Sequence, residues 1–266
     1  MKVSLSAYYE ANFIPNINLE RFHLKNRIKT LFEECNQRIG SRQIVGFLQS
    51  EGIKVSRYLV RKLMKSLNLH CLQRKAKPRS KKGKSDRNRV NLLNQCFNPP
   101  FPNEVWAGDI TYLKTAQGYR YLAVVMDLYS RRIVGWKLDT RMTSSLVIDV
   151  LQQAYSLRHP QYGCVFHSDQ GSQYTSDDFQ NKLLRLNMRS SMSGVGSCYD
   201  NAVVERFFGT LKSEAFRSSS LLNEHDLQSK ISKYMHHYNM KRLHSWTNQM
   251  SPTDFENSQI KVSGFA

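Results

Sequence analysis

The sequence predicts a mixed α/β domain that follows a helical N-terminal domain. Three observations support this fold class. Residues 1–72 show the apolar period of helices. Residues 105–138 read as strands separated by short turn signals. Helical and strand segments then alternate from about residue 143 onward, which is typical of an α/β fold.

The basic excess of the chain lies in its N-terminal part. The 266 residues carry a net charge of +18, and residues 1–100 hold 21 Lys and Arg against 6 Asp and Glu, a net of +15. The remaining 18 basic and 15 acidic side chains leave residues 101–266 at +3. Such asymmetry indicates a polyanionic partner, for which DNA or RNA fits best.

Membrane and disulfide chemistry are not expected. The first residues lack an apolar signal core, and no run approaches the roughly 20 apolar residues of a membrane span. The five cysteines include no C-x-x-C pair, which favours free thiols over a disulfide framework or a zinc site. We therefore expect a cytoplasmic, nucleoid-associated protein with no membrane partner.

Residues 1–72 predict a helical DNA-binding domain. We expect helices at 19–35, 41–50 and 57–67, with Ser41 and Ser56 as N-caps. The third helix has one apolar face, and Arg57, Arg61 and Lys65 recur every four residues on another. Helix, Gly-containing turn and basic helix form the helix-turn-helix pattern. A small helical bundle with a solvated basic face is the alternative interpretation.

Residues 73–104 predict a basic and proline-rich linker. Between residues 74 and 89 there are nine Lys and Arg and one Asp. We expect this run to be extended until it meets phosphates, although a merely solvated charge run is the alternative. The candidate phosphate contacts are Arg74, Lys75, Lys77, Arg79, Lys81, Lys82 and Lys84.

Residues 105–216 predict a mixed α/β domain. Strands at 105–114, 119–128 and 131–138 should form an antiparallel meander. A helix at 143–158, a strand at 163–168, a helix at 176–187, a strand at 188–192 and a helix at 200–216 follow. This is the element order of the ribonuclease-H-like fold. Residues 217–266 should form a helical extension with a helix at 223–244, and the tail from Thr247 shows little pattern.

Three acidic residues stand in otherwise apolar surroundings. Asp109 interrupts the first strand, Asp169 ends a later strand, and Glu205 lies within an apolar helical stretch. Ligand groups of open α/β sheets lie at the carboxyl ends of strands, so we expect the three side chains to converge. Taken singly, a strand acid can pair with Arg, a strand-end Asp can cap a turn, and a helix Glu can face solvent.

Converging carboxylates would repel one another unless a cation held them. A hard divalent ion such as Mg²⁺ prefers oxygen ligands, and Mn²⁺ is an alternative. Two such ions, about 3.5–4 Å apart, are the usual device for in-line attack on a phosphodiester. The three acids therefore indicate metal-dependent cleavage or transfer of nucleic-acid strands.

Two further residues carry structural expectations. Asp127 sits in an apolar strand beside the expected first strand, where it pairs with Arg131 or Arg132 or supports the metal ligands indirectly. Gly171 follows Asp169 in a turn, and we expect it to supply a backbone angle that other residues avoid.

Several motifs resemble the transposases of bacterial insertion sequences, in particular the second-frame (orfB) catalytic subunit of IS-three-type elements, a relative of retroviral integrases. The motifs are WAGDITYL (106–113), DLYSRRIVGW (127–136), HSDQGSQYTS (167–176), SGVGSCYDNAVVERFFGTLKSE (193–214), YNMKRLH (238–244) and SPTDF (251–255). Thirty-five residues between Asp169 and Glu205, with a Lys seven positions later, make the match specific. The resemblance covers nearly the whole chain, including the helix-turn-helix stretch.

The resemblance implies a DDE-type transposase with an integrase-like core. Asp109, Asp169 and Glu205 would be its catalytic and metal-binding triad, and Lys212 a contact to the element's end. Two Mg²⁺ ions would assist hydrolysis that frees a 3′ hydroxyl, which then attacks another phosphodiester. Tyr238, Arg242 and His244 match a motif without an assigned role.

The resemblance also implies partners. The substrates would be double-stranded DNA, both the terminal inverted repeats of the element and the target. A first-frame protein, joined by ribosomal frameshifting, would supply a further helix-turn-helix and a dimerising coiled coil, and the enzyme would act as a homo-oligomer on DNA. Two other functions remain open at this point, namely a DNA-binding protein without catalysis and a nuclease such as a ribonuclease H.

Overall fold

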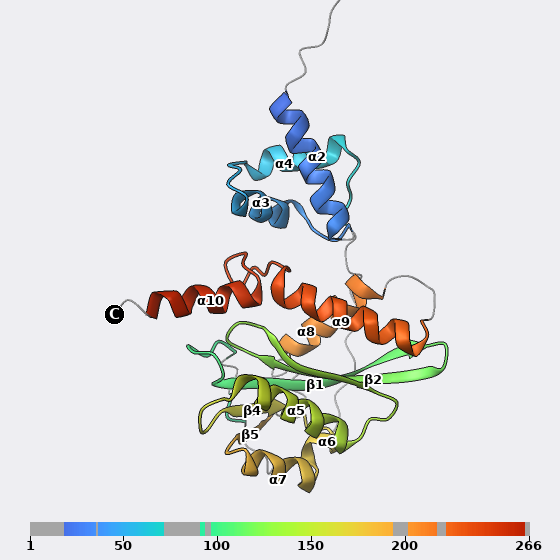
Figure 1. Cartoon of the computed structure of the whole chain (residues 1–266), viewed down its shortest axis with the longest axis vertical. Coiled ribbons are helices and arrows are strands. Elements are labelled where there is room, and N and C mark those ends of the chain that lie inside the picture. The colour runs from blue at the N-terminus through green and yellow to red at the C-terminus, as the bar shows by residue number, and fades with distance from the viewer. Residues whose placement is uncertain are drawn as a thin grey trace, which may run out of the picture. The chain divides into compact units, whose positions relative to one another are not determined.

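The chain divides into two compact units, Met1–Gln73 and Arg74–Ala266, which we describe separately. The computed structural model describes residues 19–35, 37–71, 91–93, 97–193, 202–216 and 222–263, with side chains through residue 258 (Figure 1). The finer domain boundaries at residues 105 and 217 stay predictions.

The N-terminal unit packs its helices around one apolar cluster. The helices are α2 (Leu19–Glu34), α3 (Ser41–Ser50) and α4 (Arg57–Ser66). Their buried side chains include Ile28, Leu31, Ile44, Leu48 and Leu63. α4 begins as predicted, because the Ser56 hydroxyl accepts a hydrogen bond from the backbone N–H of Leu59 at 3.2 Å.

The predicted N-cap of α3 is wrong by one residue. Gly40 is the N-cap, in an extended conformation, and its N–H donates to the Gln43 side chain at 3.4 Å. Ser41 is instead the first helical residue, and its hydroxyl accepts a hydrogen bond from Nε of Arg57 at 3.3 Å. The Ser41 hydroxyl therefore binds Arg57 at the start of α4 instead of capping α3, as the local rule predicted.

The second unit is built on a mixed five-stranded sheet. In space the strands run β3-β2-β1-β4-β5. Their bounds are β1 Val105–Thr115, β2 Gly118–Asp127, β3 Ile133–Asp139, β4 Val165–Ser168 and β5 Arg189–Met192. The first three strands pair antiparallel as the predicted meander, whereas β4 pairs parallel with both β1 and β5. The ribonuclease-H-like order of elements is thereby confirmed.

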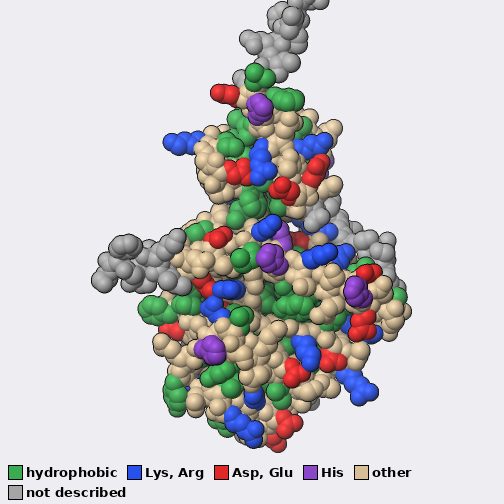
Figure 2. All heavy atoms as spheres, viewed as in Figure 1, with side chains coloured by type: hydrophobic (Ala, Val, Ile, Leu, Met, Phe, Trp, Pro, Cys, Tyr) green, Lys and Arg blue, Asp and Glu red, His purple; other side chains and the backbone are tan. Residues whose placement is uncertain are grey.

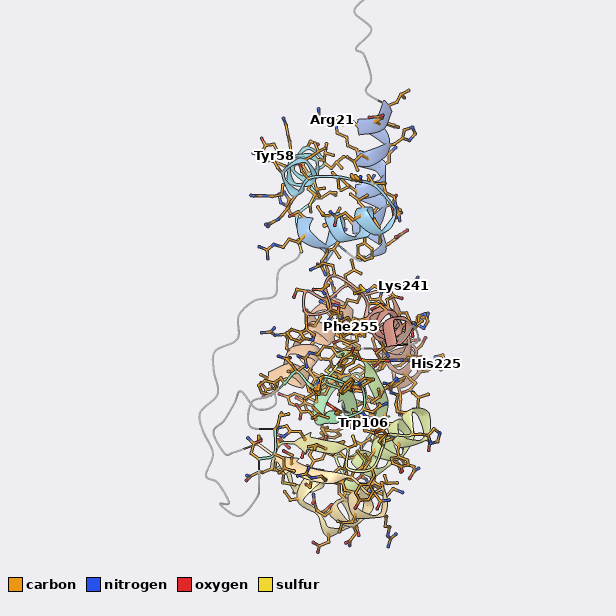
Figure 3. The ribbon with its side chains drawn as sticks, turned by 90° about the vertical axis from the view of Figure 1, so that its left-hand side faces the viewer. Arg21, Tyr58, Trp106, His225, Lys241 and Phe255 are labelled. Carbon is orange, nitrogen blue, oxygen red and sulfur yellow. The ribbon has the colours of Figure 1, made fainter. Side chains whose placement is uncertain are left out.

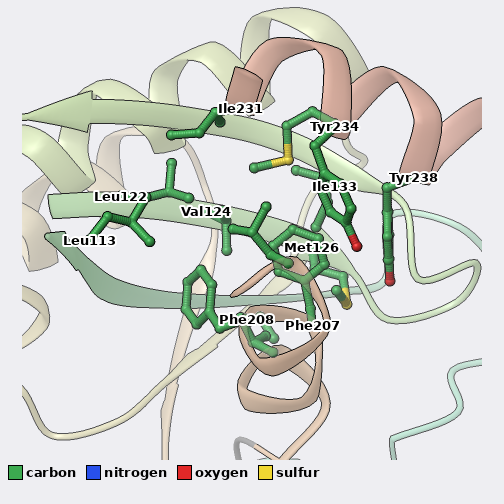
Figure 4. Close-up of a cluster of buried hydrophobic side chains, with 14 of the residues drawn as sticks. Leu113, Leu122, Val124, Met126, Ile133, Phe207, Phe208, Ile231, Tyr234 and Tyr238 are labelled. Atoms are coloured by element: carbon green, nitrogen blue, oxygen red, sulfur yellow. The ribbon is translucent and has the colours of Figure 1, made fainter. Parts of the chain in front are cut away.

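Helices cover both faces of this sheet (Figure 1). On one face lie α5 (Ser144–Arg158), α6 (Ser172–Thr175) and α7 (Asp177–Arg185), which share an apolar cluster with Trp106 and Phe166. On the other face lie α8 (Ala202–Ala215) and α9 (Glu224–Met240). Phe207 and Phe208 of α8 meet Ile231 and Tyr234 of α9 over the sheet side chains (Figure 4). The sheet is thus the middle of three layers, as an α/β fold requires.

The tail that showed little pattern contains a helix. α10 (Pro252–Ser263) begins where the Ser251 hydroxyl accepts a hydrogen bond from the N–H of Asp254 at 3.2 Å. Its sequence is mostly polar, so the helical apolar period is weak. Tertiary contacts hold it instead, including a ring contact of Phe255 with Tyr129 at 5.2 Å between centroids.

A buried ionic cluster connects α10 to the sheet. Glu256 is 5% exposed, and its carboxylate accepts hydrogen bonds from the Ser130 hydroxyl at 2.7 Å, from Arg132 at 2.8 Å and from both terminal nitrogens of Arg158 at 3.0 Å. Arg158 also reaches the fully buried Asp127 at 3.3 Å. Two buried carboxylates therefore share one guanidinium, with Arg132 adding a second cation.

The predicted partners of Asp127 are corrected by this cluster. Asp127 pairs with Arg158 and accepts backbone hydrogen bonds from Asn103 and Tyr129 at 2.8 and 3.0 Å. Arg131 has a φ of +65°, and its guanidinium donates to the carbonyl oxygens of Phe97 and Leu128 instead. Sequence proximity suggested a neighbouring arginine, but the turn after β2 aims that side chain elsewhere.

Replacing Glu256 with Gln should destabilise the second unit by about 3–5 kcal/mol, because removing one partner leaves buried charge uncompensated. Urea-induced unfolding, followed for the variant and the unaltered chain, measures this loss. The matched control is Asp149→Asn, which breaks the exposed ion pair with Lys137 and should cost less than about 1 kcal/mol. Equal losses for the two variants would contradict a stabilising role of the cluster.

Candidate active site

Asp109 lies in the middle of β1, where this strand separates from β4. β4 pairs with β1 through Val105↔Val165, Trp106↔Phe166 and Ala107↔His167. Asp109 and Asp169 each follow the last of these pairs by two residues. The two acids therefore lie just beyond the point where the pairing of β1 with β4 ends. This is the carboxyl end of β4, where open α/β sheets place ligand groups.

The backbone around Asp109 is closely packed. The half-buried side chain of Asp109 accepts a hydrogen bond from the N–H of Ile110 at 2.7 Å. At Gly108 a Cβ atom would lie 2.5 Å from the ring of Phe166 in the neighbouring strand β4, so a larger residue would clash with that ring. The glycine before Asp109 thus leaves room for the Phe166 ring to pack against β1.

Asp169 is exposed at the start of the segment after β4. Its Oδ1 accepts a hydrogen bond from the N–H of Gly171 at 3.0 Å. The expectation for Gly171 is wrong, because its φ is an ordinary −60°. A Cβ atom there would instead lie 2.9 Å from Oδ1 of Asp169, so the glycine is required by the close approach of the carboxylate.

Glu205 is exposed in the first turn of α8. The opposite face of this helix buries Val204, Phe207, Phe208 and Leu211 in the cluster that covers the sheet (Figure 4). The helix therefore turns Glu205 away from its apolar face, and packing fixes the direction in which this carboxylate points.

The three carboxylates act on one another electrostatically. Burial, followed by the charge of Asp169 and then that of Glu205, raises the pKa of Asp109 to about 8. The pKa of Glu205 is also raised, first by its partial burial and then by the charge of Asp169. Buried Tyr174 lies close enough to Asp109 and Asp169 that burial and both charges raise its pKa. The structure thus brings the three predicted acids into one electrostatic site.

The donor set of this site fits a hard divalent cation. All three groups are carboxylates, and their mutual repulsion is what a bound cation would offset. Within the described part of the chain, no three His, Cys, Asp or Glu side chains already converge as ligands of one ion. The Asp109 and Asp169 side chains instead turn back onto the N–H groups of Ile110 and Gly171. Charges act on one another over longer distances than a metal–ligand bond. The three carboxylates can therefore repel one another without already standing in the positions of metal ligands.

Lys212 reaches the same site from α8. Its ammonium lies 4.7 Å from the ring centre of Tyr112, and its charge lowers the pKa of Asp109, against the larger effects that raise it. Lys212 is two turns of helix beyond Glu205, so both side chains extend from the same stripe of α8.

The motif of Tyr238, Arg242 and His244, which had no assigned role, packs against α8. The guanidinium of Arg242 donates two hydrogen bonds to the Glu214 carboxylate, at 2.9 and 3.1 Å, and the Tyr234 hydroxyl donates a third at 2.8 Å. The ring of Tyr238 contacts Phe207 and His244 edge to face, each with 4.7 Å between centroids. The end of α9 and the turn after it therefore hold the helix that carries Glu205. Sequence reasoning missed this role because the partners lie far apart in the chain.

The predicted DNA-contacting residues fall into two groups. Arg57, Arg61 and Lys65 are exposed on α4, opposite its buried face. Tyr58 on the same helix is 76% exposed (Figure 3) and was not among the predicted contacts. Lys and Arg side chains also stand out from the face of this unit drawn in Figure 2. The linker residues from Arg74 to Lys84 lie outside the described residues.

Replacing Asp109 with Asn should stabilise the metal-free protein increasingly as the pH rises. The folded carboxyl keeps its proton up to about pH 8, whereas the unfolded one loses it near its ordinary pKa of 3.8. The free energy of unfolding of the unaltered chain therefore falls between about pH 4 and pH 8 because of this group. The variant has no such carboxyl and does not show this decrease. The difference should reach on the order of 2–3 kcal/mol at pH 8, since one pKa unit is worth about 1.4 kcal/mol and solvent screens the half-buried group.

Urea unfolding in the presence of a chelator, repeated from pH 4 to pH 8, measures this difference. The Asp178→Asn variant, altered at an exposed carboxylate of α7, is the control. If Asp109→Asn raised the free energy of unfolding by the same amount at every pH, protonation of the Asp109 carboxyl would not be the cause of the gain.

Comparisons with known proteins agree with this architecture. An HTH-like domain profile matches residues 20–77, and integrase core domain profiles match residues 99–198 and 186–252. A solved simian T-cell lymphotropic virus intasome, in complex with PP2A regulatory subunit B56 gamma, has a TM-score of 0.53 at 21% identity, covering 79% of this chain and 73% of that one. This likeness supports the fold. No helix among the described residues is long and apolar enough to span a bilayer.

Two relatives identify the family. The transposase for insertion sequence element IS904 of Lactococcus lactis is 42% identical over 241 residues, covering 90% of this chain and 95% of that protein. Transposase InsF for insertion sequence IS3A of Escherichia coli is 38% identical over 242 residues, covering 90% of this chain and 84% of that protein. The chain therefore belongs to the IS3-type insertion-sequence transposases, polynucleotidyl transferases built on an integrase core and an HTH-like domain.

Proposed function

We propose that Asp109, Asp169 and Glu205 are the catalytic triad with which this transposase cleaves the ends of its element and transfers them to new DNA. The observation that carries the proposal is the shared register of β1 and β4, which sets the two aspartates at equal steps. Glu205 joins them from α8, and the charges of the other two acids contribute to the raised pKa of Asp109. Three apposed carboxylates at a strand end suit phosphoryl transfer assisted by metal ions.

Each acid has a distinct part in this proposal. Integrase cores are as a family dependent on divalent metals, and two Mg²⁺ ions, or Mn²⁺, would be bound by this triad. The ions would supply activation of water or of a DNA 3′ hydroxyl and stabilise the departing oxygen. Asp109, the most buried of the three and subject to the charges of both other acids, would hold the ions together with them. Asp169 and Glu205 would each complete one of the two sites, while Lys212 would hold a phosphate of the element's end.

The DNA substrates follow from the two units. We expect α4 to bind the terminal inverted repeats through Arg57, Arg61 and Lys65, and the basic linker to follow the phosphates towards the core. Target DNA would be the second substrate, and several copies would act together on the paired ends. The reaction would take place in the bacterial cytoplasm, at the nucleoid. A first-frame protein, fused by frameshifting, would supply additional DNA-binding and dimerising elements.

Glu205→Gln should abolish nicking and joining of labelled element ends in the presence of Mg²⁺. The substitution keeps the shape of the side chain but removes a charged metal ligand, so we expect a loss on the order of a hundredfold or more. Gel analysis of labelled strands measures both steps. Asp178→Asn, at an exposed carboxylate outside the site, is the matched control and should remain active.

The outcomes of this assay separate the candidate functions. Nicking that is unaffected by Glu205→Gln would sink the triad proposal. Cleavage of the RNA strand of a hybrid, without joining of DNA ends, would favour a ribonuclease. Inactivity of the unaltered chain, with DNA binding intact, would point to a binding protein unless fusion to the first-frame partner restores joining.

Replacing Arg57, Arg61 and Lys65 together with Gln should weaken DNA binding and flatten its salt dependence. The slope of log K against log salt concentration is negative, and each lost phosphate contact reduces its magnitude by about 0.9. The triple change should therefore reduce the magnitude of the slope by about 2–3. Fluorescence anisotropy at several salt concentrations gives the slope, with Arg185→Gln on α7 as control. A slope equal to that of the unaltered chain would favour the helical bundle whose basic face is merely solvated.

A further inference from the structure

Two exposed tyrosine side chains lie near the turn of the β1–β2 hairpin. Tyr112 of β1 is 62% exposed and Tyr119 of β2 is 53% exposed. Their rings meet edge to face, with 5.6 Å between centroids and 89° between planes. β4 pairs with β1 only through Val105, Trp106 and Ala107, so within the described sheet no strand extends alongside this part of β1. An exposed pair of large aromatic rings is a surface that suits a ligand.

Positive charge surrounds these rings. The ammonium of Lys212 lies 4.7 Å from the ring centre of Tyr112, and exposed Lys114 pairs with Tyr119 in the strand register. Neighbouring Arg120 forms an ion pair with Glu224 at 2.8 Å, so its charge is compensated. Aromatic rings beside lysines are the combination that binds single-stranded nucleic acid, because bases stack on the rings and the lysines contact phosphates.

The tyrosine pair is close to the proposed triad. Tyr112 is three residues from Asp109 along β1, on the order of 10 Å at the rise of a strand, and the two side chains leave opposite faces of β1 where β4 no longer pairs with it. Stacked DNA advances about 3.4 Å per nucleotide, so the ring is within about three nucleotides of a phosphate at Asp109. Lys212 links the two places, because its charge acts on Asp109 while its ammonium lies over Tyr112.

We propose that Tyr112, Tyr119 and Lys212 form a stacking site for an unpaired base of the DNA strand, a few nucleotides from the scissile phosphate. The proposal rests on the proposed function, because its occupant is the strand that the triad processes. An unpaired base is specified because its faces are open to the rings, whereas a base inside a duplex is covered by its neighbours. Stacking there would hold the frayed end of the strand in place during the reaction.

The test compares binding of two DNA ends to the full chain in the presence of a chelator. One is a blunt duplex of the terminal repeat, and the other carries a three-nucleotide single-stranded extension with 2-aminopurine in it. Tyr112→Leu should weaken binding of the extended end about tenfold, because stacking is worth about 1–3 kcal/mol per base, and should restore the fluorescence that stacking quenches. Binding of the blunt end should be unchanged.

Two further variants make the comparison specific. Tyr112→Phe keeps the ring and should bind the extended end like the unaltered chain. Tyr162→Leu removes a tyrosine that is even more exposed, at 87%, in the segment before β4, and should also have no effect. Thermal unfolding checks that each variant folds, which we expect because the altered side chains are exposed.

Several results would overturn the stacking site. One is that the unaltered chain binds the extended end no better than the blunt end. Another is that Tyr112→Leu weakens binding of both DNA ends equally. The last is self-association of the chain that Tyr112→Leu abolishes without affecting DNA binding. The last result would assign the surface to a second copy of the chain. Failure of the triad proposal is distinguishable, because it would leave Glu205→Gln active in nicking whatever the binding of the extended end.

Discussion

The repulsion between carboxylates at one end of the sheet is the constraint on which the rest of the structure depends. Asp109 and Asp169 stand at equal steps of neighbouring strands, and Glu205 adds a third charge from a helix. Repelling groups stay together only where packing holds their backbones. Apolar clusters on both faces of the sheet provide that packing, so the energy of the core maintains the apposition of the acids.

The C-terminal elements add ion pairs to the apolar packing of α9. Glu214 binds Arg242 and Tyr234, which fixes the end of α9 against α8. Glu256 with Arg158 does the same for α10 against the end of α5. Charged contacts of this kind require specific geometry, because a buried charge without its partner is costly. The helix that carries Glu205 is therefore oriented in part by Arg242, which lies 37 positions further along the chain.

Local patterns in the sequence were enough for most of the fold. Alternation and turn signals located the strands of the meander, and the predicted cap at Ser56 is confirmed. The failures occurred where a long-range contact competes with a local preference. Ser41 serves Arg57 instead of capping α3, and Asp127 pairs with Arg158 instead of an adjacent arginine.

The sequence by itself determined the class of fold, the three acids and the family resemblance, because these depend on residue type and spacing along the chain. The tertiary structure decided what depends on distance in space. It set the pairing of β1 with β4 that ends two residues before both Asp109 and Asp169, the pairing of Arg242 with Glu214, and the exposure of Tyr112 beside Lys212. No local period encodes which side chains meet across layers, since that choice follows from how the helices pack on the sheet.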